Sequence, residues 1–260
     1  MKTIITKKIG FYLLVLFAVV ACDDKDEEAA TPDPTVSASC RITQIADDDE
    51  EVSKIEYNNA GYITKVTETD EDDDVYTTTF IYDANNRLIK EENREDGDLD
   101  DYRTFAYTNN LVTSSTYYDV EDGSEYTTTY KYDANNRKIE ETDEDDYKNT
   151  YTYDANGNIS KIESFYNNVL SYRQIFENYD DKPAYYSALK GLPSVYFEAS
   201  KNNPGKTTYY SDRDGNGTID ATPNDVINYT YKYNSNGFPT VIKETSGTDT
   251  YTTTLTYQCN

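Results

Sequence analysis

The chain has 260 residues and a formal net charge of −25, with 49 acidic and 24 basic side chains. It holds 28 tyrosines but no histidine and no tryptophan. So negative a chain repels nucleic acid and anionic lipid surfaces, and cations are its natural counter-partners. Without histidine it has no imidazole general base, which excludes the histidine-dependent classes of enzyme.

Residues 1–21 predict a secretory signal peptide. The segment starts with lysines and continues as an apolar run over 9–21 that is too short to span a bilayer. The four residues VVAC at 19–22 resemble the lipobox of bacterial lipoproteins, in which cleavage leaves the cysteine as the lipid-bearing first residue. The resemblance predicts lipidation of Cys22, and an ordinary signal peptide with an incidental cysteine is the alternative.

Residues 22–37 predict an acidic, disordered tether, because they hold two prolines and almost no large apolar side chain. A flexible chain of this length spans on the order of 20 Å. The run CDDKDEE at 22–28 is similar to the export tag of Bacteroidota lipoproteins displayed on the outer face of the outer membrane. The similarity implies an outer-membrane lipoprotein, exposed on the cell surface, whose membrane contact is the lipid anchor.

Over residues 38–260 one unit recurs, an aromatic strand that ends at a tyrosine and enters a tight turn. The tyrosines at 57, 82, 107 and 132 are each 25 residues apart. Copies of the turn read YNNAGY at 57–62, YDANNR at 82–87 and 132–137, YDANGN at 153–158 and YNSNGF at 233–238. Aspartate can bind backbone amides two residues on, and asparagine or glycine accepts the left-handed conformation of short hairpin loops. The self-similarity indicates one supersecondary unit copied many times, a Tyr-Asp repeat.

Between the turns, aromatic and polar side chains alternate strictly, as in YTTTYKY at 126–132, and this pattern is typical of strands. We expect strands at 40–46, 51–57, 62–69, 75–82, 87–94, 102–108, 111–119, 125–132, 137–143, 148–153, 158–166, 169–177, 206–212, 226–233, 238–246 and 249–259. An even number lets the first and last strands run antiparallel and pair. The prediction is an all-β, antiparallel up-and-down meander of about 16 strands, closed or flattened into a barrel, with one short helical insertion.

The shape and environment of this sheet stay open. A round barrel of this size leaves a channel, so either a flattened section or the insertion has to fill it. A membrane-embedded porin would turn apolar side chains outward, whereas this chain is rich in tyrosine and threonine. We therefore expect a porin-like but soluble barrel with a core built from inward tyrosines. Leu88 and Ile89 put apolar groups on both faces, and the sequence does not decide which points in.

Cys40 and Cys259 are predicted to form a disulfide, the default in an exported chain, with two free thiols as the alternative. Disulfide geometry requires alpha carbons within about 7 Å. The first and last strands should therefore be neighbours, which closes the sheet.

The connections alternate in kind. Tight turns fall at one end of the sheet, and acidic stretches fall at the other, at 47–51, 70–74, 96–101, 119–125 and 143–146. The tether and both terminal cysteines belong to the tight-turn end, so the acidic rim should point away from the membrane. Two interpretations of the rim stay open, namely solvation that keeps sheet edges apart and the binding of cations.

The strand pattern breaks between the twelfth and thirteenth strands, at the tight-turn end. Asp181 as a cap, Pro183 at the first position and Gly191 after the last turn predict a helix over about 183–190. Its apolar side chains, among them Leu189, would plug the open end of a barrel.

The stretch DRDGNGTID at 212–220 resembles the calcium loops of EF-hand and dockerin proteins. Alternate residues there can turn oxygen atoms toward one hard cation, and a glycine permits the sharp bend. Pro223 stands where those loops carry a bidentate acid, so Asn224 or Asp225 would have to substitute. The candidate Ca2+ ligands are Asp212, Asp214, Asn216, Thr218, Asp220 and Asp225. A hairpin without an ion is the alternative.

The runs SKNNP at 200–204 and NGFPT at 236–240, together with the Tyr-Asp turns and the terminal cysteines, resemble an uncharacterised family of Bacteroidota lipoproteins with a porin-like fold. The resemblance spans residues 40–259 and implies the fold, but it brings no activity and no site residues. The turns alone also resemble the Tyr-Asp repeats of Rhs-type toxin shells.

No set of residues predicts catalysis, because the sequence has no histidine and no glycine-rich phosphate loop, and its cysteines are assigned to lipid and disulfide. We expect no enzyme, no catalytic residue and no nucleic-acid partner. The expected function is a surface module that binds or adheres to an unknown extracellular protein or glycan. A structural surface coat and a carbohydrate-binding or carbohydrate-processing accessory protein are the alternatives.

Overall fold

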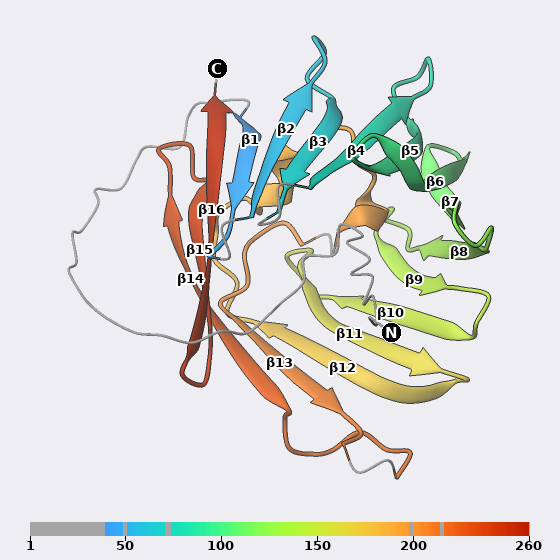
Figure 1. Ribbon diagram of the computed structural model, residues 1–260. Helices are drawn as coiled ribbons and strands as arrows, with labels where there is room; N and C mark the ends of the chain where they lie inside the picture. Colours follow the sequence, from blue (N-terminus) through green and yellow to red (C-terminus); the bar gives the residue numbers. More distant parts are fainter. Residues whose placement is uncertain (1–39, 49–50, 71–73, 198–199, 214–215, 260) are drawn as a thin grey trace, which may run out of the picture.

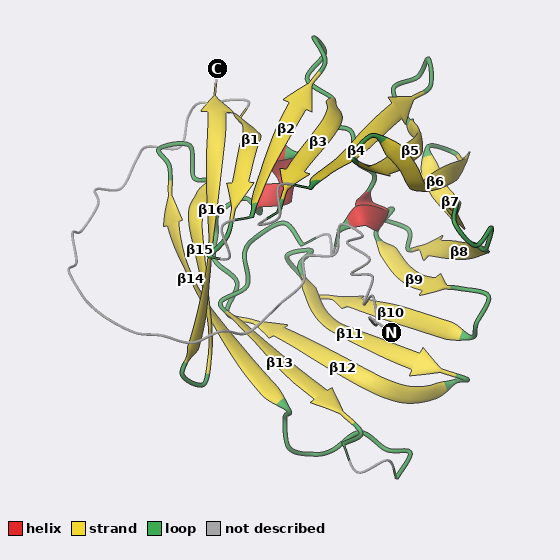
Figure 2. Ribbon diagram, viewed as in Figure 1, coloured by secondary structure: helices red, strands yellow, loops and turns green. Residues whose placement is uncertain are grey.

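The computed structural model describes residues 40–48, 51–70, 74–197, 200–213 and 216–259. In this part of the chain, sixteen strands form one closed antiparallel barrel, in which each strand pairs with its neighbours in sequence and β16 returns to β1 (Figures 1 and 2). The predicted all-β meander and its closure are confirmed. The expected signal peptide, the lipidation site Cys22 and the tether lie outside the described residues.

The strand boundaries follow the predicted ones closely. The strands are β1 (Cys40–Ala46), β2 (Val52–Tyr57), β3 (Ile63–Thr69), β4 (Val75–Tyr82), β5 (Leu88–Glu95), β6 (Asp98–Thr108), β7 (Leu111–Asp119), β8 (Glu125–Tyr132), β9 (Lys138–Thr142), β10 (Tyr147–Tyr153), β11 (Ile159–Tyr166), β12 (Val169–Glu177), β13 (Lys206–Ser211), β14 (Asp225–Tyr233), β15 (Pro239–Ser246) and β16 (Asp249–Cys259). The prediction of an acidic loop over residues 96–101 is wrong. Asp96 and Gly97, both at positive φ, complete a two-residue turn, so Asp98, Leu99 and Asp101 pair with β5 as part of β6.

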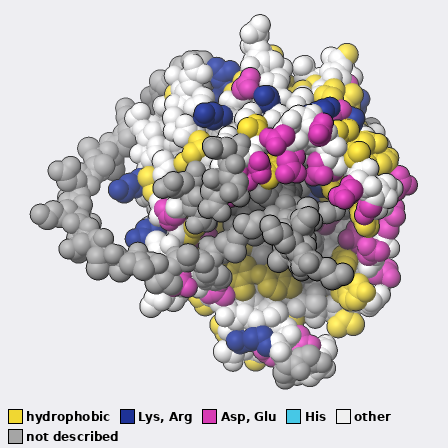
Figure 3. Space-filling view, in the orientation of Figure 1, with side chains coloured by type: hydrophobic (Ala, Val, Ile, Leu, Met, Phe, Trp, Pro, Cys, Tyr) yellow, Lys and Arg dark blue, Asp and Glu magenta, His cyan; other side chains and the backbone are white. Residues whose placement is uncertain are grey.

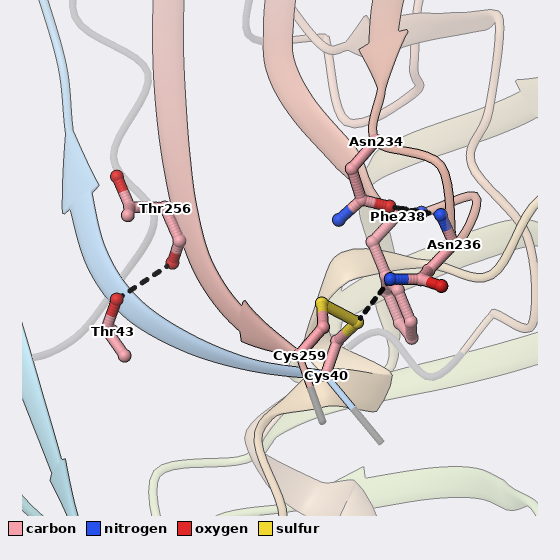
Figure 4. The surroundings of a disulfide bond; sticks show 7 residues. All are labelled: Cys40, Thr43, Asn234, Asn236, Phe238, Thr256 and Cys259. Carbon is pink, nitrogen blue, oxygen red and sulfur yellow. Dashed lines mark hydrogen bonds between the residues drawn. A yellow bond between two sulfur atoms is a disulfide. The ribbon is translucent and has the colours of Figure 1, made fainter. Parts of the chain in front are cut away.

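The seam of the barrel lies between β1 and β16 (Figure 4). Cys40 pairs with Cys259 in the register, and the two are joined by a disulfide. The side-chain amide of Asn236, in the turn between β14 and β15, lies 3.4 Å from the Cys40 sulfur. The predicted disulfide between Cys40 and Cys259 is therefore confirmed, and it fixes the first strand to the last at the tight-turn end.

The register slips by one residue at the repeat tyrosines, for example between Ile81 and Tyr82 and between Lys131 and Tyr132. Each slip is a β-bulge that turns the first residue after the tight turn toward the interior. Leu88 accordingly has none of its surface exposed, whereas Ile89 is 38% exposed. The bulge thus decides which of the two apolar side chains points in.

The fully buried core is aliphatic. Its members include Ile42, Ile63, Val66, Leu88 and Val112. The expectation of a core built from tyrosines is only partly met, since the repeat tyrosines pack around this cluster and remain partly exposed. Their hydroxyl groups need hydrogen-bond partners, and they find them at the edge of the core.

The insertion between β12 and β13 fills the tight-turn end, as predicted, but not with the expected helix over 183–190. It contains two short 3-10 helices, η1 (Tyr185–Ala188) and η2 (Ser194–Tyr196), which lie inside the ring of strands (Figure 2). Ala184 is extended, and Gly191 has a positive φ of 106°, so the chain cannot continue helically on either side. In the described part of the chain, no helix is long and apolar enough to cross a membrane.

Candidate functional site

The tight turns are held by their aspartates. Asp83 accepts hydrogen bonds from the backbone amides of Asn85 and Arg87 at 2.8 and 2.9 Å, and its other oxygen accepts one from the Arg87 guanidinium at 2.8 Å. Asp133 repeats this pattern with Asn135 and Arg137. The backbone amide of Arg87 and its guanidinium hold the pKa of the Asp83 carboxyl below its ordinary value. The role predicted for aspartate in these turns is confirmed.

A second hydrogen bond explains why each repeat carries tyrosine at the strand end. In five of the repeats the tyrosine hydroxyl donates to the backbone carbonyl of a residue at or near the start of an earlier strand of the barrel. These bonds run from Tyr57 to Ile42 (2.7 Å), Tyr82 to Ile63 (2.8 Å), Tyr107 to Leu88 (2.7 Å), Tyr132 to Val112 (2.8 Å) and Tyr153 to Lys138 (2.7 Å). Phenylalanine would fill the same space without making this bond. We call these five contacts the tyrosine clamps.

The insertion is bonded to the wall on both sides of the barrel. In the turn between β10 and β11, the side-chain oxygen of Asn158 accepts hydrogen bonds from the backbone amides of Lys201 and Asn202, at 2.9 and 3.0 Å. On the other side, the backbone carbonyl of Lys190 accepts a hydrogen bond from the amide of Ile63 at 3.0 Å. A side chain at Gly191 would collide with the rings of Tyr62 and Tyr82, so only glycine allows this approach.

Tyr196 joins the insertion to the inner wall formed by β4, β5 and β6. Its ring packs against Phe80 and Phe105, with centroids 6.4 and 5.6 Å away, and its hydroxyl donates to the carboxyl of Glu91. Burial raises the pKa of Glu91 to about 7, although Arg103, 3.7 Å away, opposes the shift. The tight-turn end, with the disulfide, the tyrosine clamps and the insertion, is therefore a packed and closed end.

The opposite end is formed by the acidic connections and differs in its surface. Most of the large apolar side chains that are exposed in the described residues lie here, at the ends of strands or in the loops between them: Val75, Val120, Tyr126, Tyr147, Tyr166 and Val169. Figure 3 shows acidic side chains over the region of β4 to β9, with hydrophobic ones between them. We call this end the acidic rim, and its exposed apolar groups were not predicted from the sequence.

The candidate calcium loop connects β13 to β14 at this rim. The carboxylate of Asp212 accepts hydrogen bonds from the backbone amides of Asn216 and Gly217, at 3.1 and 2.7 Å, so it turns into the loop. The side-chain oxygen of Asn216 accepts a bond from the amide of Thr218 at 2.9 Å. Asp212, Asn216 and Thr218 therefore share a compact loop, while Asp214 lies outside the described residues.

Two other candidate ligands face elsewhere. The carboxylate of Asp220 lies 3.1 Å from the Arg213 guanidinium. Asp225 accepts hydrogen bonds from Ser246 and from the amide of Val226 on the barrel wall. Among the described residues, no three acidic or cysteine side chains lie close enough together to hold a metal ion. Calcium binding by this loop stays a prediction.

The fold is thus a closed antiparallel barrel with one packed end and an acidic rim at the other end. It is similar to the crystal structure of a porin-like protein from Bacteroides uniformis, with a TM-score of 0.57 and 16% identity, over 86% of this chain and 98% of that one. The likeness confirms the porin-like fold and, at this identity, shows the fold alone.

Other comparisons add little. A Tc holotoxin pore from Photorhabdus luminescens matches 80% of this chain but 10% of its own, at 16% identity and a TM-score of 0.23, which does not indicate a shared fold. No family model and no curated protein matches the chain.

Proposed function

We propose that this chain is a lipid-anchored protein of the outer-membrane surface that binds an extracellular protein or glycan through its acidic rim. The observation that carries the proposal is the separation of the two ends. Cys40, where the described chain begins, lies at the packed end, and the exposed apolar side chains gather at the other. A lipid on Cys22 would hold the packed end toward the membrane and present the rim outward. Exposed apolar groups of this kind mark interaction surfaces.

Two experiments test this function. In cells that produce the full chain, a protease added outside should cleave the rim loops, and Cys22→Ser should release the protein from the membrane fraction. Beads coated with the chain should then capture a ligand from arrays of extracellular proteins and glycans. Protection of the chain in intact cells would contradict the surface location, and an empty array would favour a structural coat.

We further propose that calcium stiffens the loop between β13 and β14. The inward carboxylate of Asp212 supports this role, because it holds the backbone of the loop in place around Gly217. Calcium at ten times its dissociation constant should add about 1.4 kcal/mol to the free energy of unfolding. Thermal melting with calcium and with a chelator measures this, and Asp214→Ala should abolish the difference. Identical melting curves would show that calcium does not bind the folded chain.

A further inference from the structure

The inner surface of the barrel changes character toward the acidic rim. Six tyrosines lie on the inward face of β7, β8 and β10–β13 in this half: Tyr117, Tyr126, Tyr147, Tyr166, Tyr172 and Tyr209. Their inward direction follows from the alternation along each strand, since Tyr147 lies four residues before the buried Tyr151, and Tyr166 four residues after the buried Ile162. We call this surface the tyrosine wall.

The tyrosine wall is open to solvent. Tyr126, Tyr147 and Tyr166 face inward, yet they keep 45–52% of their surface exposed. At the other end the same face is covered by the insertion and the aliphatic core. Among the described residues, the interior is therefore filled at the packed end, and these three rings are less covered. Neighbouring rings lie close enough to form one surface, with centroids 4.7 Å apart for Tyr147 and Tyr166 and 6.0 Å apart for Tyr172 and Tyr209.

The charges along the tyrosine wall are negative. Asp101 of β6 and Asp119 of β7 are directly opposite each other in the register, and each is only 8% exposed. Asp101 accepts a hydrogen bond of 2.6 Å from Asn93, and burial raises the pKa of its carboxyl. Asp119 accepts hydrogen bonds from the backbone amides of Glu121 and Asp122, at 3.0 and 3.2 Å. Two carboxylates at paired positions still repel one another, and a nearby cation would offset that cost.

The basic residues of the same strands do not neutralise this wall. On β6–β12, four of them lie on the outward face, Lys131, Lys148, Lys161 and Arg173. The inward ones are Arg103, 3.7 Å from Glu91, and Lys138, 2.8 Å from Glu141. An incoming cation would therefore find carboxylates and aromatic faces, which are the two groups that attract it.

On the outer surface of the barrel, a similar pair of tyrosines is in contact with a lysine ammonium. Tyr102 and Tyr118 form an outward pair with centroids 4.6 Å apart, and the ammonium of Lys90 lies 4.1 Å from the Tyr102 ring. The inward pair of Tyr147 and Tyr166 is spaced almost equally, at 4.7 Å, with its rings tilted by 34°. Among the described residues, no lysine or arginine lies over either of its rings. The outward pair has its cation within the chain, and the inward pair is placed to receive one from a partner.

We propose that the tyrosine wall binds an arginine- or lysine-bearing peptide segment of a partner protein. Adjacent strands are about 4.8 Å apart, so the wall from β8 to β12 spans about 19 Å, the length of roughly six extended residues. Arginine suits the site best, because its planar guanidinium stacks on tyrosine and pairs with carboxylates. This inference rests on the proposed function, in which the rim faces outward toward partners. It adds the chemical class of the ligand.

Hexaarginine is the probe, titrated into the full chain by isothermal calorimetry at low and at physiological salt. The double variant Tyr147→Ala with Tyr166→Ala should weaken binding at least tenfold. Its matched control, Tyr102→Ala with Tyr118→Ala on the outer face, should stay within twofold of the wild type. Thermal melting of both variants confirms that each is folded.

A second comparison separates binding at the tyrosine wall from general attraction of hexaarginine to a negatively charged protein. It uses two double variants that each lose two negative charges. Asp101→Asn with Asp119→Asn should weaken hexaarginine binding at least tenfold, whereas Glu56→Gln with Glu140→Gln, on the outer face, should change it less than threefold. Equal losses in both pairs, or no binding by the wild type, would overturn the inference.

Cellohexaose serves as the neutral probe. If cellohexaose binds and hexaarginine does not, with the same dependence on Tyr147 and Tyr166, the occupant is a glycan and the peptide is ruled out. An array ligand captured by the chain regardless of Tyr147 and Tyr166 would leave the proposed surface function standing and overturn this inference alone.

Discussion

The two ends of the barrel are built from the same strands and differ in what holds them. At the packed end, aspartate or asparagine side chains hold most of the tight turns, five strands end in a tyrosine clamp, and the insertion packs against the buried aliphatic core. At the acidic rim, three tyrosines on the same inward face, Tyr126, Tyr147 and Tyr166, stay about half exposed. The repeat therefore places its stabilising contacts at the packed end and leaves tyrosine rings exposed at the rim.

The largest effect is expected at the seam. The disulfide between Cys40 and Cys259 closes a loop of 219 residues in sequence, so it restricts the unfolded chain strongly. Replacing both cysteines by serine should lower the free energy of unfolding by about 3–5 kcal/mol. Urea denaturation of the variant beside the wild type measures this. A change below about 1 kcal/mol would mean that the strand pairing of β1 and β16 closes the barrel without help.

The next largest effect compares the two faces of one strand. Leu88→Ala removes a side chain that is fully buried at the packed end and should cost about 3 kcal/mol. Ile89→Ala removes an outward side chain and should cost less than about 0.5 kcal/mol. Equal costs in urea denaturation would contradict the bulge-determined direction of these residues.

The pH dependence of stability probes Glu91, where the insertion contacts the barrel wall. Burial raises the pKa of Glu91 to about 7, from an ordinary value near 4.5. The folded state therefore binds more protons than the unfolded state in this interval, so the free energy of unfolding falls as the pH rises from about 4.5 to 7. Glu91→Gln should remove roughly 1–3 kcal/mol of this fall.

The measurement is the difference in stability between the wild type and Glu91→Gln at pH 5 and at pH 7.5. The difference isolates Glu91 from the repulsion among the many other carboxylates, which both proteins share. An unchanged difference at the two pH values would mean that Glu91 is not the group that titrates.

The smallest effect concerns the tyrosine clamps. Tyr132→Phe keeps the ring and loses the 2.8 Å hydrogen bond to the carbonyl of Val112, so it should cost about 1 kcal/mol. Tyr126→Phe, on the same strand at the rim, should cost less than about 0.5 kcal/mol because its ring is half exposed. Equal costs in chemical denaturation would show that the two ends do not differ in this way.

Much of this architecture could be predicted from the sequence because it repeats. The regular spacing of the tyrosines and the alternation between them predicted the strands, and the two terminal cysteines predicted where the sheet closes. The direction of Leu88 could not be predicted, since it depends on a one-residue bulge that the alternation does not reveal. The expected helix failed because residues 183–190 are shaped by contacts with distant strands rather than by local capping.

The candidate site was less accessible to sequence reasoning. The acidic loops were visible as charge runs, but the tyrosine wall depends on which face of each strand turns inward and on where the insertion stops. The contact of Tyr196 with Glu91 joins residues 105 positions apart. The sequence did carry a signal for the tyrosine clamps. The strand-ending residue is tyrosine, and not phenylalanine, at positions 57, 82, 107, 132 and 153.

The difference between the ends is tested most directly by the reactivity of the tyrosines. Nitration of the folded chain near pH 8, followed by peptide mass spectrometry, ranks the rings by their access to reagent. Tyr126, Tyr147 and Tyr166 should react first. Tyr57, Tyr107 and Tyr153 should react slowly, because their hydroxyls are bonded to carbonyls and burial raises their pKa to about 12. Equal reactivity of the two groups, or protection of the rim tyrosines, would contradict a barrel that is packed at one end and open at the other.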